Sequence, residues 1–313
     1  MNHMVTMYKN FVVVFFSSSV LLAGCATPAS YTKPITKFQE ASTAVIEDAR
    51  AEYITSNQRE LEAFIDKNYF NRQPITLKDL NSSSVYLLNN DDLVARLQAL
   101  DVLTKHASLL LALSSSNAPE KAKTAATELD ESVISLKQSL GGNVSDNFKT
   151  GATLLTDGIG ELTLLITENK INKALDRSII LSENEVQNII KLLKKDMDII
   201  YQRKKTIVSN YRVNSVRDYN NQLVSGKNDA DKLNELANNI KKSESEWNKL
   251  SLSLSIQSNF ETMSQAYKEL VDYAKSSKTP QDISDLNDAI DVYVARAKLI
   301  KDNLNYLKNN IGE

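Results

Sequence analysis

Apolar side chains recur every three or four positions along most of this chain, which is the spacing of one face of an α-helix. The pattern is cleanest in the last third of the chain. One stripe comprises Leu233, Leu236, Ile240, Ser243, Trp247, Leu250 and Leu254, and it resumes one position out of register as Ile256, Phe260, Met263, Tyr267, Leu270 and Ala274. The other stripe comprises Ile283, Leu286, Ile290, Tyr293, Ala297, Ile300, Leu304 and Leu307. Between them, Thr279 and Pro280 provide a helix cap and a first-turn proline, so two long helices are predicted.

The same period predicts further helices upstream. They are expected over 35–70, from Asn90 onward, from Pro119 to Leu140 and over about 146–177, with a short helix and a loop in 75–90. Gly141 and Gly142 provide a left-handed stop. The run Ser182-Glu183-Asn184-Glu185 matches a capping box, which predicts the start of a long helix that ends near Gly226.

Composition agrees with this pattern. The chain has 313 residues but eight glycines and five prolines, far fewer than an all-β chain of this length would need. We therefore predict an all-α fold, an elongated antiparallel helical bundle with coiled-coil-like heptad packing. Helices of roughly 40 residues would give a rod about 60 Å long. The short connections favour closure within one molecule, although a seam between two molecules would have the same period.

The N-terminus has the layout of a secretory signal. Lys9 precedes an apolar run from Phe11 to Leu22, interrupted by 17–19, and the run ends in small residues. A helix needs about 20 apolar residues to cross a bilayer, so this run is too short to span one. Met1, Met4 and Met7 are alternative start positions, and the choice leaves the mature protein unchanged.

The run ends in Leu22-Ala23-Gly24-Cys25, which resembles the lipobox of bacterial lipoprotein precursors. The resemblance covers the signal peptide and the cleavage site and nothing of the body. It implies cleavage before Cys25, a diacylglycerol on the cysteine sulfur and an anchor of acyl chains in a membrane. A single cysteine forms no disulfide framework, which agrees with this role.

The same resemblance addresses localisation. Ala26 follows the cysteine, and Asp there would retain an enteric lipoprotein in the inner membrane. Ala26 therefore implies the periplasmic face of the outer membrane in a Gram-negative organism. In a Gram-positive organism, the same residues imply the outer leaflet of the plasma membrane.

Three regions are expected on these grounds. Residues 1–24 form the lipoprotein signal peptide, residues 25–34 the lipidated cysteine and a short tether, and residues 35–313 the helical bundle. Pro28 and Pro34 are expected to prevent a continuous helix in the tether, so the folded body should begin near Ile35.

Charge and residue inventory exclude several function classes. The net charge is −2, which provides no electrostatic footprint for nucleic acid. His3 leaves with the signal peptide, and His106 is expected to be structural or exposed. The chain has no phosphate-binding glycine loop, no Gly-x-Ser-x-Gly elbow and no His-Glu-x-x-His. We therefore predict no enzyme activity, no cofactor and no metal site. Residue type alone does not exclude catalysis by two carboxylates, because the chain contains the acidic pairs Asp91-Asp92 and Glu128 with Glu131.

The segment Gly151 to Ile171 is rich in small and apolar residues, and its part 151–166 is almost uncharged except for Asp157 and Glu161. One interpretation is a central helix packed on all sides. The other is a membrane-inserting hairpin, as in the helical pore-forming toxins that this architecture loosely resembles. Asp157 and Glu161 would be costly in hydrocarbon, which favours the first interpretation.

Two function classes remain. The first is a non-catalytic envelope lipoprotein that binds or spaces a protein partner, as an adaptor, an assembly factor or a toxin-immunity protein. An exposed aromatic patch would identify it, with Tyr69, Phe70, Tyr86 and Trp247 as candidates, although their burial in the core is the simpler expectation. The second is a membrane-active, pore-forming-like protein. The sequence predicts no specific partner and no oligomeric state.

Overall fold

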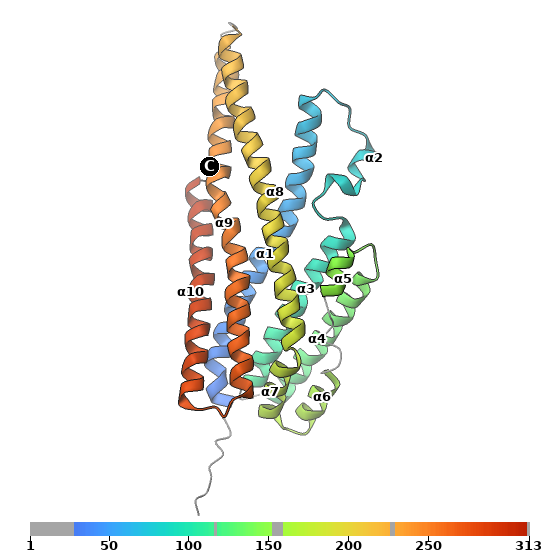
Figure 1. The fold of residues 1–313 in the computed structure, drawn as a ribbon, viewed down its shortest axis with the longest axis vertical. Coiled ribbons are helices and arrows are strands. Elements are labelled where there is room, and N and C mark those ends of the chain that lie inside the picture. The colour runs from blue at the N-terminus through green and yellow to red at the C-terminus, as the bar shows by residue number, and fades with distance from the viewer. Residues whose placement is uncertain (1–27, 116–117, 152–158, 226–228, 312–313) are drawn as a thin grey trace, which may run out of the picture.

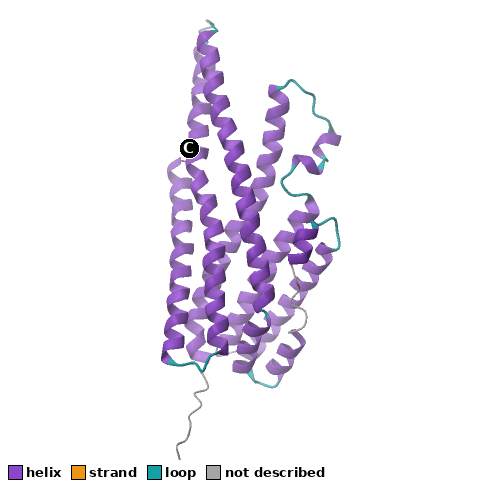
Figure 2. Cartoon of the chain, viewed as in Figure 1, coloured by secondary structure: helices purple, strands orange, loops and turns teal. Residues whose placement is uncertain are grey.

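The computed structural model describes residues 28–115, 118–151, 159–225 and 229–311, and these residues form helices and loops without a strand (Figures 1 and 2). The expected signal peptide and Cys25 lie outside the described residues. The helices are α1 (Pro28–Phe70), α2 (Leu77–Leu80), the 3-10 helix η1 (Ser83–Val85), α3 (Asn90–Ser114), α4 (Ala118–Leu140), α5 (Asp146–Gly151), α6 (Ile159–Thr167), α7 (Ile171–Leu181), α8 (Glu183–Val224), α9 (Ala230–Lys275) and α10 (Pro280–Ile311). The predicted all-α bundle is therefore confirmed.

The long helices run side by side and give the molecule its elongated shape (Figure 1). α8 and α9 form an antiparallel hairpin, and α10 folds back along α9. α1 contacts α3 on one side and α9 and α10 on the other, and α4 packs against α3. The predicted cap between α9 and α10 is present, because the amide of Asp282 donates to Thr279 Oγ1 at 3.3 Å.

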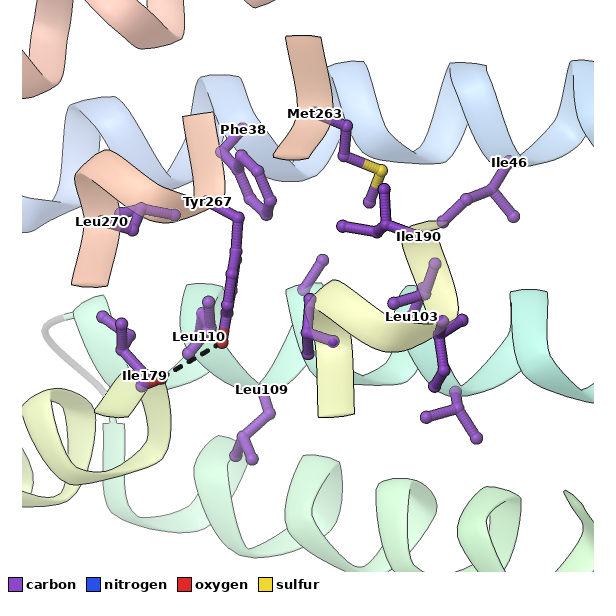
Figure 3. Packing of buried hydrophobic residues seen from close by; sticks show 14 of the residues in the cluster. Phe38, Ile46, Leu103, Leu109, Leu110, Ile179, Ile190, Met263, Tyr267 and Leu270 are labelled. Carbon is purple, nitrogen blue, oxygen red and sulfur yellow. Dashed lines mark hydrogen bonds between the residues drawn. The ribbon is translucent and has the colours of Figure 1, made fainter. Parts of the chain in front are cut away.

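The core follows the apolar stripes predicted from the sequence. Phe38 of α1 lies between the rings of Tyr267 and Tyr293, at centroid distances of 6.0 and 5.7 Å. Figure 3 shows Tyr267 reaching across the core toward Ile179, whose carbonyl accepts a hydrogen bond from the tyrosine hydroxyl at 3.3 Å. Burial of these large side chains provides most of the free energy that holds the helices together.

A buried ionic network joins three helices. The Arg96 guanidinium on α3 donates to Asp196 of α8 through Nε and to Asp92 through Nη1, both at 2.8 Å. The Tyr53 hydroxyl of α1 donates to the same Asp196 carboxylate at 3.0 Å. Burial raises the pKa of Asp196, although Arg96 and the Tyr53 hydroxyl act to lower it. The network is stable because each buried charge has a partner.

The first helix begins earlier than expected. α1 starts at Pro28 and continues through Pro34, so the expected tether over 26–34 is wrong for most of its length. Pro34 cannot donate the backbone hydrogen bond of its turn. Tyr31, Ile35 and Phe38 are nonetheless buried in the core on this helix, and their burial outweighs the lost bond.

The single helix expected over 146–177 is also wrong, because this region contains α5, α6 and α7. Asn169 adopts a left-handed backbone with φ 56° and ends α6. The amide of Lys170 donates to the carbonyl of Leu165, and the amide of Asn169 donates to that of Ile166. This pair of bonds is a Schellman motif, which closes the helix end and turns the chain.

The capping box expected at Ser182 does not form, although α8 does begin at Glu183. The Ser182 side chain makes no capping bond and instead donates to the carbonyl of Ser178 at 2.5 Å. Its Oγ also lies 2.6 Å from the Tyr267 hydroxyl. The tertiary contact therefore replaces the local cap.

Candidate functional site

A cleft of about 540 Å³ opens between α1, α8 and α9. It lies at the end of the bundle opposite the beginning of α1, where α1 diverges from the α8–α9 hairpin (Figure 1). We call it the α1–α8–α9 cleft. Its lining comprises Arg59, Glu62, Ala63, Asp66 and Tyr69 of α1, Ile207, Val208, Tyr211, Asn214, Ser215 and Asp218 of α8, and Leu236, Asn239, Lys242 and Glu246 of α9.

The apolar part of the cleft comes from the same stripes that build the core. Val208 and Leu236 are buried and belong to the inward faces of α8 and α9. Closer to the beginning of α1, stripe positions such as Phe260 of α9 pack against other helices. At the cleft, the stripe positions Val208 and Leu236 line an open cleft instead. The floor of the cleft is thus a continuation of the core.

Buried charges flank the inner part of the cleft. Lys204 of α8 is 7% exposed and lies 3.3 Å from the Glu52 carboxylate of α1. Burial lowers the pKa of Lys204, whereas Glu52 acts to raise it. Arg59 lies 3.6 Å from the same carboxylate. On the adjacent surface, Arg203 forms a bidentate pair with Glu60 at 2.8 and 2.7 Å. The Lys204–Glu52 and Arg203–Glu60 pairs connect α1 to α8 at the point where the two helices begin to separate.

Two buried polar groups lie at the cleft. Ser215 is 4% exposed and lines the cleft, and its hydroxyl interacts with the side chain of Tyr211, which acts to lower the pKa of Tyr211 against the effect of burial. The Nη1 atom of Arg59 is buried and, among the described residues, makes only the long ion pair with Glu52. Buried polar groups normally have partners in native proteins, so this Arg59 atom is available to a ligand or to water in the cleft.

The four aromatic candidates do not gather into one patch. Tyr69 is 78% exposed and lines the cleft, whereas the side chain of Phe70 lies outside the described residues. Tyr86 is half-buried near η1. Trp247 is half-buried beneath the Arg212 guanidinium, which lies 4.5 Å from the ring centroid. Only Tyr69 of the three described side chains belongs to the candidate site.

His106 of α3 is buried against α9 and the junction of α7 with α8. Its Nε2 lies 2.9 Å from the Tyr267 hydroxyl and 3.2 Å from Ser182 Oγ. Burial lowers the pKa of His106 to about 4, so the ring is neutral at pH 7. A serine, a histidine and a tyrosine thus meet, but all three are buried and far from the cleft, and the cluster is part of the core.

Three of the four acids in the two predicted pairs have structural partners. Asp92 binds Arg96 and also accepts the Ser145 amide at 3.0 Å, and Asp91 accepts the amide of Asn143 at 3.0 Å. Glu128 pairs with Lys105 at 3.0 Å. Within the described ranges, no group of three or more His, Cys, Asp or Glu side chains is placed to hold a metal ion.

The segment Gly151 to Ile171 is described in part, because residues 152–158 lie outside the described residues. In α6, Leu162, Leu165 and Ile166 are buried in the common core, and Glu161 pairs with Arg177 at 2.8 Å. Of the helices that the structure describes, none is both long enough and apolar enough to cross a membrane.

Sequence reasoning missed the cleft. The sequence gives little sign of it, because Tyr211 and Leu236 fit the apolar stripes of their helices as ordinary core positions do. Glu62 and Asp66 are like charges four residues apart on α1, a spacing that mildly destabilises a helix. This pair is the local signal that could have drawn attention to this surface of α1.

Comparisons of this chain with protein-family models, with curated proteins and with solved structures find no match.

Proposed function

We propose that this protein is a lipid-anchored envelope protein that binds another protein in the α1–α8–α9 cleft and performs no catalysis itself. The anchor is Cys25, in the lipobox-like run that ends the signal-like N-terminus. The observation that carries the binding role is the cleft, whose floor is formed by buried core-type side chains such as Val208 and Leu236. Such concave, partly apolar surfaces are the usual sites of recognition.

The position of the cleft fits an anchored binding protein. α1 begins at Pro28, three residues after Cys25, so the acyl chains would hold this end of the bundle close to the membrane. Arg59, where the cleft begins, lies 31 residues farther along the same helix. At about 1.5 Å per residue, α1 would carry the cleft roughly 50 Å away from the lipid. The bundle then works as a rigid spacer that presents a binding site to the aqueous compartment.

The test fills the cleft without altering the core. Asn214 lines the cleft and is half-buried, so Asn214→Trp would occupy part of its volume. Asn220 lies on the same helix, is exposed and does not line the cleft, which makes Asn220→Trp the matched control. Each acylated protein is crosslinked in its native envelope and purified with its bound proteins. The proposal expects a specific partner with the wild type and the control and its loss with Asn214→Trp.

The membrane-active alternative has its own test. Release of dye from liposomes by the purified chain lacking residues 1–25 would favour it. The burial of Leu162, Leu165 and Ile166 supports the opposite expectation of no release, because these side chains would have to leave the core before α6 could enter a bilayer.

A further inference from the structure

The cleft has the shape of a bundle in which one helix is missing. The loop before α3 meets α1 at Asn57, whose Nδ2 donates to the carbonyl of Leu88 at 2.9 Å. On the other side, α10 follows α9 past Ser258, which accepts from Arg296 Nε at 3.0 Å. Among residues whose side chains are described, α3 and α10 contribute nothing to the lining. α10 continues along α9 past this contact and ends at Ile311, and above its end the α8–α9 hairpin and the last part of α1 continue without it (Figure 1).

The charge of the lining is predominantly negative. Four acidic residues and two basic residues line the cleft. Of the two bases, Arg59 pairs with Glu52. Of the four acids, Glu246 pairs with Lys249 at 3.1 Å and Asp218 lies 3.7 Å from Arg217. Glu62 and Asp66 are exposed on α1, and Asp218 lies across the cleft on α8. An occupant that carries positive charge would therefore be attracted, and one that carries negative charge would be repelled.

The tyrosines of the lining favour the same kind of occupant. Tyr69 of α1 and Tyr211 of α8 present aromatic rings at the cleft. The face of such a ring attracts lysine and arginine side chains, while its edge and hydroxyl tolerate contact with water. Val208 and Leu236 lie deeper and would receive apolar side chains. The lining thus has an apolar floor and an acidic, aromatic rim.

The walls of the cleft determine the backbone conformation of the occupant. All three walls are helices whose backbone hydrogen bonds are made within the helix, so they offer no edge to an extended peptide. A helix satisfies its own backbone and needs only side-chain contacts. We propose that the cleft binds a basic amphipathic helix of a protein partner, which would complete the bundle at this end. This inference rests on the proposed binding function.

Synthetic peptides test the inference with a defined probe. The probe is a peptide of about 14 residues, or about 21 Å as a helix, with leucines on one face and lysines and arginines elsewhere. Its binding to the mature chain carrying Cys25→Ser, which needs no detergent, is followed by fluorescence anisotropy. We expect micromolar binding that weakens as salt is added. We expect no binding of the same peptide with glutamates in place of its basic residues, or of a scrambled peptide without an apolar face.

Matched variants locate the binding in the cleft. The cleft variant combines three substitutions, Glu62→Gln, Asp66→Asn and Asp218→Asn. It should bind the peptide about tenfold more weakly, since each rim charge is worth a few tenths of a kcal/mol to about 1 kcal/mol. The control also removes three acids, one exposed acid outside the lining from each of the three helices that form the cleft: Glu47→Gln, Asp198→Asn and Asp272→Asn. It should bind as the wild type does. Lys242→Glu should tighten binding, which tests the charge argument in the opposite direction.

Several results would overturn the inference. These are no measurable binding of the basic peptide, equal binding of the acidic peptide, or equal effects of the cleft variant and its control. The proposed function would survive these results if Asn214→Trp still released the native partner. It would fail separately if that substitution left the native partner bound.

Discussion

The Nε2 atom of His106 on α3 lies 2.9 Å from the hydroxyl oxygen of Tyr267 on α9, inside the core of the bundle. Ser182, at the junction of α7 and α8, contacts both groups. The contact joins three parts of the chain, and it requires a neutral imidazole because a charged ring would be buried without a counter-ion.

This arrangement predicts a pH dependence of stability. Burial lowers the pKa of His106 to about 4 in the folded protein, whereas the unfolded value is about 6.5. Between these values the unfolded chain binds more protons, so the free energy of unfolding falls as the pH falls from about 6.5 to 4. The loss from this residue should reach about 3 kcal/mol. Urea unfolding of wild type and His106→Gln across this range measures it, and identical pH slopes would contradict the assignment.

The buried pair of Arg96 and Asp196 predicts strong coupling. Arg96→Met should lower the free energy of unfolding by about 3–5 kcal/mol, because the Asp196 carboxylate would stay buried without its main partner. The double variant Arg96→Met with Asp196→Leu should be more stable than the single variant, since no buried charge is then left at position 196. Denaturant titrations of both single variants and the double variant give the coupling energy. Additive effects would show that the two residues act independently.

The early start of α1 predicts that Tyr31 contributes to stability. Its ring packs edge-on against Tyr273 at a centroid distance of 4.9 Å, and its hydroxyl donates to Asp176. Tyr31→Ala should cost about 3 kcal/mol of unfolding free energy. Lys33→Ala, at an exposed neighbouring position, should cost almost nothing. If residues 26–34 were a flexible tether, both variants would unfold at the wild-type denaturant concentration.

Sequence periodicity predicted the bundle because its strongest elements are long and regular. The stripes of α9 and α10 extend over many turns, and Thr279 with Pro280 marks the boundary between them. The errors fall where a local preference competes with a tertiary contact. Pro34 argues against a helix, but burial of Tyr31 and Ile35 outweighs it.

The other errors have similar causes. Asn169 can take a left-handed backbone, yet nothing in its neighbourhood marks the end of α6. Ser182 has the sequence of a cap but serves the core instead. The cleft exists because α3 and α10 cover α1 and α9 along only part of their length. The period of an apolar stripe does not show where a neighbouring helix begins or ends.

Lipidation predicts that the mature chain carries a modified sulfur. Two or three acyl chains stabilise membrane attachment by about 0.8 kcal/mol per buried CH₂ group, so Cys25→Ser should move the protein from the membrane fraction to the soluble fraction. Mass analysis of the N-terminal peptide from the wild-type protein should show the mass of a diacylglycerol on Cys25. An unmodified thiol on a chain that still sediments with membranes would refute the anchor.

The most direct test of the central claim, that a protein partner occupies the α1–α8–α9 cleft, is site-specific photocrosslinking in the native envelope. A photoreactive residue at position 69 lies at the cleft, where Tyr69 is 78% exposed, and one at position 292 lies on α10, where Val292 is 62% exposed. The account predicts a discrete protein adduct from position 69 and none from position 292. Adducts of equal yield from both positions, or an adduct from position 292 alone, would contradict it.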